Sequence, residues 1–283
     1  MINGVTYTPC STLNNVDARR RFSIERPADG AKIGFASEGE ASGVQSYHGM
    51  LLSIQRRAAR GLVLNANYTL SHCIGPYATL YDARLLWPYQ TYTVPNNRRA
   101  DRGNCDSDRR QVFNVSAVAE TPQFSNRTMR LLASGRKFSG IYSFSAGSPL
   151  NILAGTDRAL TGISDQRANQ INGNPYKDKF AGPLSQFLNP AAFAQPDTGT
   201  IGNVGRNTVQ GPNTWSFDMG VSRAFSLRER QRVEFRAEAC NILNKFRPGN
   251  PNTTLSKGKY QTGIRLGEFS GAPQDAQHLD ARS

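Results

Sequence analysis

The stretch WSFDMGVSRAFSLRERQRVEFRAEACNILNKF, residues 215–246, decides the fold. Its apolar residues recur at every second position in two arms: Trp215, Phe217, Met219 and Val221, then Val233, Phe235, Ala237 and Ala239. A period of two gives a strand one apolar and one polar face. The short charged segment 227–231 between the arms is typical of a hairpin turn. The stretch therefore predicts a β-hairpin.

An amphipathic helix is the local alternative. Arg, Glu and Ala favour helices, and Phe235, Ala239 and Ile242 also fit helical spacing. We favour the strand, because it alone accounts for both arms.

The rest of the chain repeats this pattern. Alternating segments occur at 47–55, 62–70, 111–120 and 129–146, with a short one at 33–37 in a mostly exposed N-terminal loop. Long segments rich in Gly, Pro and Asn follow at 75–108 and 150–213. Short connections at one end and long ones at the other predict an all-β fold, a partial antiparallel transmembrane β-barrel of about eight strands with short periplasmic turns and long extracellular loops. A secreted soluble β-sandwich that binds carbohydrate through aromatic loops is the alternative.

The composition limits the classes of protein to which this chain can belong. The mean hydropathy is −0.52, and the sequence contains no run of about 18 apolar residues that would form a transmembrane helix. A membrane barrel remains possible, because its apolar residues stand at alternate positions. The net charge is +13, but the arginines are scattered at strand ends and turns. We expect solvated strand ends or an acidic lipopolysaccharide surface around them and no nucleic acid. A basic nucleic-acid-binding β protein is a further alternative, and it predicts steeply salt-dependent DNA binding.

The segment before the hairpin carries a resemblance. LNPAAFAQPDTGTIGNVGRNTVQGPNTWSFDMGVSRAF, residues 188–225, is similar to the last part of the barrel in TonB-dependent outer-membrane receptors of the Oar-like family, which carry a carboxypeptidase-regulatory-like domain. That family has the pattern NPxAF…GTxGNxGRNxxxGP before a strand pair ending in FRAExxNxxN. The matching residues are Asn189, Pro190, Ala192, Phe193, Gly202, Asn203, Gly205, Arg206, Asn207, Gly211, Pro212 and 235–244. The resemblance covers roughly Asp17 to Thr254.

The resemblance implies the C-terminal part of a plugged barrel of roughly 22 strands in the cell outer membrane. Such a receptor takes up or binds a large or scarce solute, which the sequence does not name, and needs neither catalysis nor a cofactor in this segment. The implied partners are outer-membrane lipid, lipopolysaccharide, the solute, and the TonB system through missing N-terminal parts.

The two ends depart from the family pattern. The start has no signal-peptide pattern, and the match fades after Thr254, although 260–269 keeps a weak alternation. We assign 1–270 to the barrel segment and 271–283 to a polar divergent tail. A chain with open sheet edges is expected not to assemble alone into a functional barrel.

No catalytic, cofactor or metal site is predicted. His48, His72 and His278 are too few and too far apart for a zinc site. Segment 199–211, GTIGNVGRNTVQG, lacks the Lys-Ser/Thr pair of a phosphate loop and indicates a turn-rich loop. Ser71 has no nucleophile-elbow context.

The alternation assigns side chains to the two faces of the hairpin. The lipid-facing residues are Trp215, Phe217, Met219, Val233, Phe235 and Ala237, and the lumen-facing ones are Asp218, Glu234, Arg236 and Glu238. Glu234, Arg236 and Glu238 are interpreted as a structural charge ladder together with Arg232. The aromatic residues at strand ends, Tyr68, Tyr142 and Trp215, suit a membrane-interface girdle; for Trp87 and Tyr89 the sequence leaves girdle and sugar stacking open.

Four cysteines allow three full pairings. Cys73 and Cys105 lie where the strands flanking the first long loop leave the barrel on the same side, so we predict that they pair, and that Cys240, inside a strand, and Cys10 stay free. Unrelated loop cysteines are the alternative.

A substitution on each face tests this assignment. Phe235→Lys in the full-length protein should impair assembly, since a charge on the lipid face near the midplane costs about 2–4 kcal/mol. Glu234→Lys should be tolerated. The measurement is the fraction of heat-modifiable protein in outer membranes, and equal effects would show that the faces are reversed.

Overall fold

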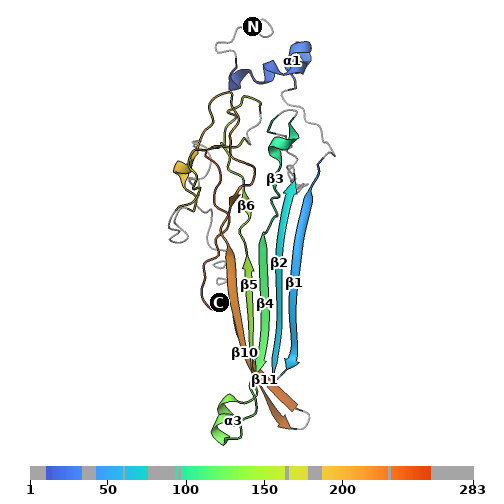
Figure 1. The fold of residues 1–283 in the computed structure, drawn as a ribbon, viewed down its shortest axis with the longest axis vertical. Coiled ribbons are helices and arrows are strands. Elements are labelled where there is room, and N and C mark those ends of the chain that lie inside the picture. The colour runs from blue at the N-terminus through green and yellow to red at the C-terminus, as the bar shows by residue number, and fades with distance from the viewer. Residues whose placement is uncertain are drawn as a thin grey trace.

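The computed structural model describes residues 11–33, 43–59, 61–75, 93–94, 97–162, 166–177, 187–228 and 231–255. One tall antiparallel sheet dominates it (Figure 1). Its strands are β1 (Ser46–Ala59), β2 (Leu62–Gly75), β3 (Gly103–Asn104), β4 (Gln111–Glu120), β5 (Arg136–Ser145), β10 (Thr214–Arg228) and β11 (Gln231–Ala239). The order is β1-β2-β4-β5-β10-β11, with the short β3 on β2. The all-β antiparallel fold is as predicted, and the helical alternative for the second arm is wrong.

The long strands form three hairpins. β1 pairs with β2, β4 with β5 and β10 with β11, each antiparallel. The two neighbouring hairpin contacts, β2 with β4 and β5 with β10, follow long connections. The repeated order of strand, short turn, strand and long loop is therefore present.

The connection between β4 and β5 differs from the prediction. Met129 was expected in a strand, but it lies in helix α3 (Arg127–Ala133). The Asn126 side chain accepts a hydrogen bond from Thr128 N at 2.9 Å, which caps the helix. Gly135, at φ 65°, reverses the chain before β5. This local capping chemistry outweighed the weak alternation.

The N-terminal segment also differs from the expected loop. It forms short helices: η1 (Leu13–Asn15), η2 (Asp17–Arg19), α1 (Arg21–Glu25) and α2 (Pro27–Gly30). The fully buried Asn15 accepts bonds from Thr12 N and Arg19 Nε, both at 3.0 Å. The expected strand at 33–37 is absent at Ile33, and its other residues lie outside the described part. None of the helices described is long and apolar enough to cross a membrane.

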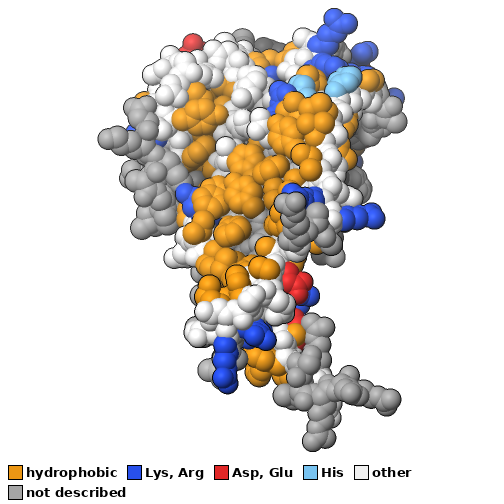
Figure 2. All heavy atoms as spheres, turned by 60° about the horizontal axis from the view of Figure 1, so that its bottom comes forward, with side chains coloured by type: hydrophobic (Ala, Val, Ile, Leu, Met, Phe, Trp, Pro, Cys, Tyr) orange, Lys and Arg blue, Asp and Glu red, His pale blue; other side chains and the backbone are white. Residues whose placement is uncertain are grey.

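Strand register gives the sheet one apolar and one polar face. Residues directly opposite in antiparallel strands point to the same side. One transverse row is apolar: Leu52, Tyr68, Phe113, Phe144 and Trp215. The adjacent row is polar: Ser53, Asn67, Asn114, Ser143 and Ser216. Hydrophobic side chains accordingly gather over one face of the strands (Figure 2).

The buried core lies in the loops rather than on the sheet. The connection from β5 to β10 contains β6 (Pro149–Leu150), β7 (Asn169–Gln170), η4 (Pro190–Ala192), β8 (Phe193–Ala194) and β9 (Val209–Gln210). β6 pairs with β9, and β7 with β8. The core residues are Leu150, Ile152, Ala168, Leu188, Ala192, Phe193, Val204 and Val209. We call this folded connection the loop assembly, at the end of the sheet opposite α3 (Figure 1).

A disulfide joins Cys73 in β2 to Cys105, directly after β3, the pairing expected from the sequence. Their Cα atoms are 5.4 Å apart, and Cys105 N donates to Cys73 O at 3.1 Å. Cys240 is free and exposed, one residue beyond β11 rather than inside a strand. Cys10 and the tail 271–283 lie outside the described residues, as do the weak alternation at 260–269, Trp87 and Tyr89.

We expect Cys73→Ser to lower the free energy of unfolding by about 2–4 kcal/mol, because the bridge restricts the unfolded chain. Cys240→Ser should leave stability unchanged. Urea titration in detergent gives the difference, and mass spectrometry of non-reduced peptides reports the bridge directly. A free Cys73 in the wild-type protein would contradict the assignment.

Candidate functional site

The apolar face carries a row of aromatic rings at its loop side. Tyr68 and Phe113 have ring centroids 6.4 Å apart, and Tyr142 lies 6.1 Å from both Phe113 and Trp215. The row therefore crosses β2, β4, β5 and β10. Lys245 Nζ stands 5.6 Å from the Trp215 ring centroid, a cation–π contact. Rings with a polar tip and a neighbouring cation suit a membrane–water interface.

A second aromatic group lies at the turn side of the same face. Phe225 and Phe235 pack edge to face with centroids 6.0 Å apart, and the Arg223 guanidinium lies 4.7 Å above the Phe225 ring. Phe138, opposite Val221, extends the group onto β5. The side chains are exposed: Phe235 keeps 67% of its surface accessible.

The separation of the two groups fits a bilayer. Trp215 and Phe225 are ten residues apart in β10, which corresponds to about 33 Å along a strand. A strand tilted by about 40° then spans about 25 Å, the height of the apolar band of an outer-membrane barrel. Phe217, Met219 and Val221 fill the interval on this face. An exposed apolar band of this shape needs a partner that is not water.

The opposite face is polar, and its charged side chains are concentrated on β11. Ser53 Oγ lies 2.8 Å from Asn67 Oδ1, and Asp218 Oδ1 accepts from Asn241 N at 2.7 Å. On β11, Arg236 lies 3.6 Å from Glu234 and 3.4 Å from Glu238, so these side chains form a charge ladder. Strand pairing places both predicted sets of residues on separate faces, because Val221 opposes Ala237 while Gly220 opposes Glu238.

The sequence matches the outer membrane beta barrel domain family over residues 2–277. The chain belongs to this family. Its location is the outer membrane, and such barrels are generally non-enzymatic. Comparison with curated proteins and with solved structures gives no match.

A buried ionic junction fixes the loops of this barrel domain. Asp101, at the end of η3 (Arg98–Asp101), is 1% exposed. Its carboxylate accepts from Arg167 Nη1 at 2.6 Å and from Thr93 N and Oγ1 at 2.6 and 2.7 Å. Arg206 Nη1 donates to the Asp101 carbonyl at 3.3 Å. The junction links the first long loop to the loop assembly.

The GNVGRNT stretch contributes the second half of this junction. Asn207 Nδ2 donates to Asp106 Oδ1 at 2.6 Å and to Asn104 O at 2.7 Å, and Asn104 Nδ2 returns a bond to Asn207 O at 2.8 Å. A Cβ on Gly103 would lie 2.3 Å from Arg206 O, so this close approach requires glycine. The stretch is a turn-rich loop, as predicted, and its Arg206 and Asn207 side chains are buried, which was not predicted.

The two histidines of the described strands, His48 and His72, lie side by side on the sheet. His48 opposes His72 on β1 and β2, and His72 Nδ1 lies 3.5 Å from Asp108 Oδ2. Within the described ranges no three His, Cys, Asp or Glu side chains converge as ligands. His278 lies outside those ranges. Ser71 Oγ donates to Arg109 O at 3.0 Å, so this hydroxyl joins β2 to the segment just before β4.

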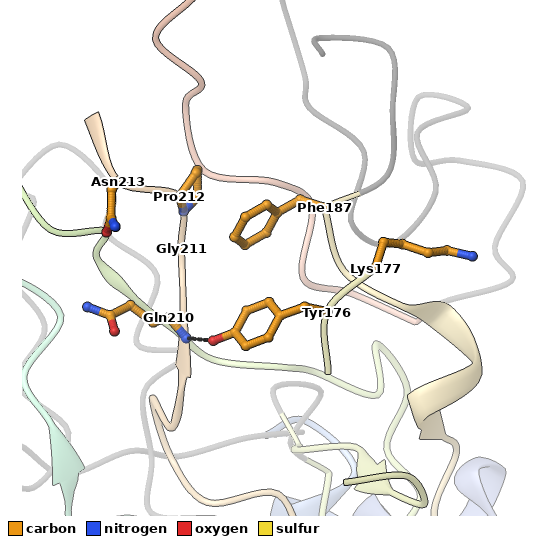
Figure 3. Close-up of a pocket in the computed structure, with 7 residues that line it drawn as sticks. All are labelled: Tyr176, Lys177, Phe187, Gln210, Gly211, Pro212 and Asn213. Carbon is orange, nitrogen blue, oxygen red and sulfur yellow. Dashed lines mark hydrogen bonds between the residues drawn. The ribbon is translucent and has the colours of Figure 1, made fainter. Parts of the chain in front are cut away.

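A cavity of about 310 Å³ opens in the loop assembly (Figure 3). The rings of Tyr176 and Phe187 point toward the segment from Gln210 to Asn213, and Lys177 extends away from them. The ring centroids are 5.6 Å apart, and the Tyr176 hydroxyl accepts from Gln210 N at 3.0 Å. A phenol hydroxyl can donate one hydrogen bond as well as accept, so the Tyr176 hydroxyl can also act as a donor. The cavity is at the small end of ligand sites, about 300–1,000 Å³.

Sequence reasoning missed the roles of Asp101 and Arg167. Both stand in polar loop sequence without periodicity, so neither signals burial. Only the charged run around 98–110 hinted at a function beyond solvation, since long loops in compact domains are uncommon without one.

Arg167→Met should destabilise the loop assembly by about 3–5 kcal/mol, because it leaves the buried Asp101 carboxylate uncompensated. Arg236→Gln, in the exposed ladder, should cost less than about 1 kcal/mol. Hydrogen exchange at amides of the loop assembly measures both. Equal protection in the Arg167 variant and the wild type would contradict a structural role for the junction.

Proposed function

We propose that this chain forms part of the wall of a TonB-dependent receptor of the Oar-like kind, which binds or takes up a large or scarce solute. The observation that carries the proposal is the ordered series of motifs from NPAAF to FRAEACNILN. These motifs occupy structurally defined places. Asn189 caps η4 through Ala191 N, Ala192 and Phe193 enter the loop core, and Arg206 enters the junction.

The open sheet supports a wide barrel. In the described part, β1 and β11 each have one long-strand neighbour and end the sheet. Backbone groups along such edges must be paired in lipid. Six long strands whose two edges are open suit a segment of a large barrel better than a complete small one. Further strands of the proposed receptor would pair with both edges.

The loop assembly is the proposed place of solute contact. Its described part has its own core and a cavity lined by the rings of Tyr176 and Phe187, which offers a solute a preformed surface. Long loops of outer-membrane barrels lie outside the cell. In this orientation the residues proposed to face lipid are Trp215, Phe217, Met219, Val233, Phe235 and Ala237, and the loop-side aromatic row with Lys245 would meet lipopolysaccharide.

The alternative of a soluble β-sandwich does not fit the described sheet. A sandwich buries the inner faces of two sheets against each other. The one large sheet described here instead leaves large apolar side chains exposed, from Leu52 on β1 to Phe235 on β11. Membership of the outer-membrane barrel family accounts for that exposure.

A medium-depletion experiment tests the proposed function for a solute of any identity. Strains with the intact gene, with the gene deleted and without TonB are grown in the same medium, and remaining compounds are measured by mass spectrometry. We expect a compound that only the intact strain depletes. Cys240→Ser serves as matched control and should deplete it normally. Depletion that continues without TonB would contradict energised uptake.

A further inference from the structure

We propose that His48 and His72 form a binding site for a divalent transition-metal ion, with Cu²⁺ bound most tightly. The two residues lie directly opposite each other on β1 and β2, near the loop end of the first hairpin. Residues opposite each other in antiparallel strands point to the same side, with Cβ atoms about 4.5–5.5 Å apart. Two nitrogens bound to one ion at about 2.0–2.1 Å are at most about 4 Å apart, so both imidazoles can reach the same ion.

Both rings can be reached from outside the protein. His48 is exposed, and His72 keeps 28% of its side chain exposed. Of the two ring nitrogens of His72, Nδ1 and not Nε2 is buried without a partner. Figure 2 shows the histidine side chains of the described residues, in pale blue, at the surface beside the apolar patch. Nε2 of His72 is therefore the nitrogen that is available to an ion.

The Asp108 carboxylate is placed to orient the His72 ring. Nδ1 of His72 lies 3.5 Å from Asp108 Oδ2, and neither atom has a hydrogen-bond partner among the described groups. Asp108 is itself held in place, because its Oδ1 accepts from Cys73 N at 3.1 Å and its N–H donates to Cys105 O at 3.0 Å. A metal-ligating histidine usually gives its other ring N–H to a carboxylate, which fixes the tautomer.

This arrangement explains why two buried polar atoms face each other without a formed hydrogen bond. With its proton on Nδ1, His72 presents the Nε2 lone pair to the ion. The bound ion polarises the Nδ1–H group and strengthens its attraction to the Asp108 carboxylate. Asp108 is thus a positioning residue and not a third ligand.

The chemistry of the pair selects the class of ion. Arg110 Nε lies 3.5 Å from Asp108 Oδ2, so the carboxylate charge is offset and attracts a cation only weakly. Binding then depends on the imidazoles, which suit Cu²⁺, Ni²⁺ and Zn²⁺, whereas Mg²⁺ and Ca²⁺ prefer oxygen ligands. Sites of this kind generally bind Cu²⁺ most tightly among these ions. Two histidines are too few for the closed shell of structural zinc, so water would complete an open site.

This inference goes beyond the proposed transport and does not depend on it. A barrel without TonB dependence would keep the histidine pair, and loss of metal binding would leave the proposed uptake untouched.

Titration of Cu²⁺ into the full chain in neutral detergent, followed by calorimetry and electron paramagnetic resonance, tests the proposal. The protein carries no histidine tag, and a Cys10→Ser/Cys240→Ser background leaves only the bridged cysteines, because a free thiolate would also bind the metal. We expect one Cu²⁺ per chain with hyperfine splitting from two imidazole nitrogens. Zn²⁺ should bind more weakly, and Mg²⁺ should not compete.

Single variants identify the ligands. His48→Gln and His72→Gln should each lower the Cu²⁺ affinity at least about 100-fold, and Asp108→Asn should lower it about 10–100-fold, as for loss of an outer-shell partner. At saturating Cu²⁺ the Asp108 variant should still show two nitrogens, which a variant that had lost its fold would not. His278→Gln removes the third histidine of the sequence and, as the matched control, should bind like the wild type.

The Cys73–Cys105 bridge, checked in every variant by mass spectrometry of non-reduced peptides, serves as the test of folding. If His72→Gln lacks the bridge, the exposed His48→Gln decides the result. Equal Cu²⁺ affinity of His48→Gln and the wild type would overturn the proposal. So would a spectrum with one nitrogen, a loss shared by His278→Gln, or displacement of Cu²⁺ by Mg²⁺.

Discussion

The backbone hydrogen bonds of the large sheet are the constraint on which the remaining structure depends. In a bilayer no water is available for N–H and C=O groups, so each strand must be paired along its length. Antiparallel pairing fixes the register, and the register fixes the faces. Because the side-chain period is two, a slip by one residue would bring the polar row of Ser53 and Asn67 to the place of Leu52 and Tyr68. The two-faced sheet is therefore strongly specified.

The described sheet has no buried apolar core, whereas the loop assembly has one. The two parts are therefore stabilised in different ways. The strands are stabilised by hydrogen bonds and by contact with lipid, while the loop assembly contains a compact apolar core with Ile152 and Leu188 fully buried. Water on the loop side makes that burial favourable. The disulfide and the Asp101 junction tie this core to the end of β2 and to the first long loop. The described parts of the two long connections are thereby bonded to one another.

Basic residues have different roles at the two ends of the sheet. At the loop side Arg167 and Arg206 are buried and bonded to Asp101 and Asp106, so their charges are compensated inside the protein. At the turn side Arg136 and Arg223 oppose each other across a strand pair. The overall charge of +13 thus does not describe one basic surface. Part of it belongs to the buried, ion-paired guanidinium groups of Arg167 and Arg206.

The sequence by itself determined the long strands, their hairpin order and the alternation of apolar and polar side chains, because a period of two can be recognised within each strand alone. The short strands β3 and β6 to β9, in the long connections, were not predicted. β4 was predicted with its observed bounds, 111–120, and the Cys73–Cys105 pairing followed from the expected strand ends. Local capping at Asn126 and around Asn15 outweighed weaker patterns and produced helices that were not predicted. Only the tertiary structure decided which loop side chains are buried. Asp101 and Arg167 are 66 residues apart, and no local pattern can show that two charged loop residues meet, since their burial exists only once both loops have packed.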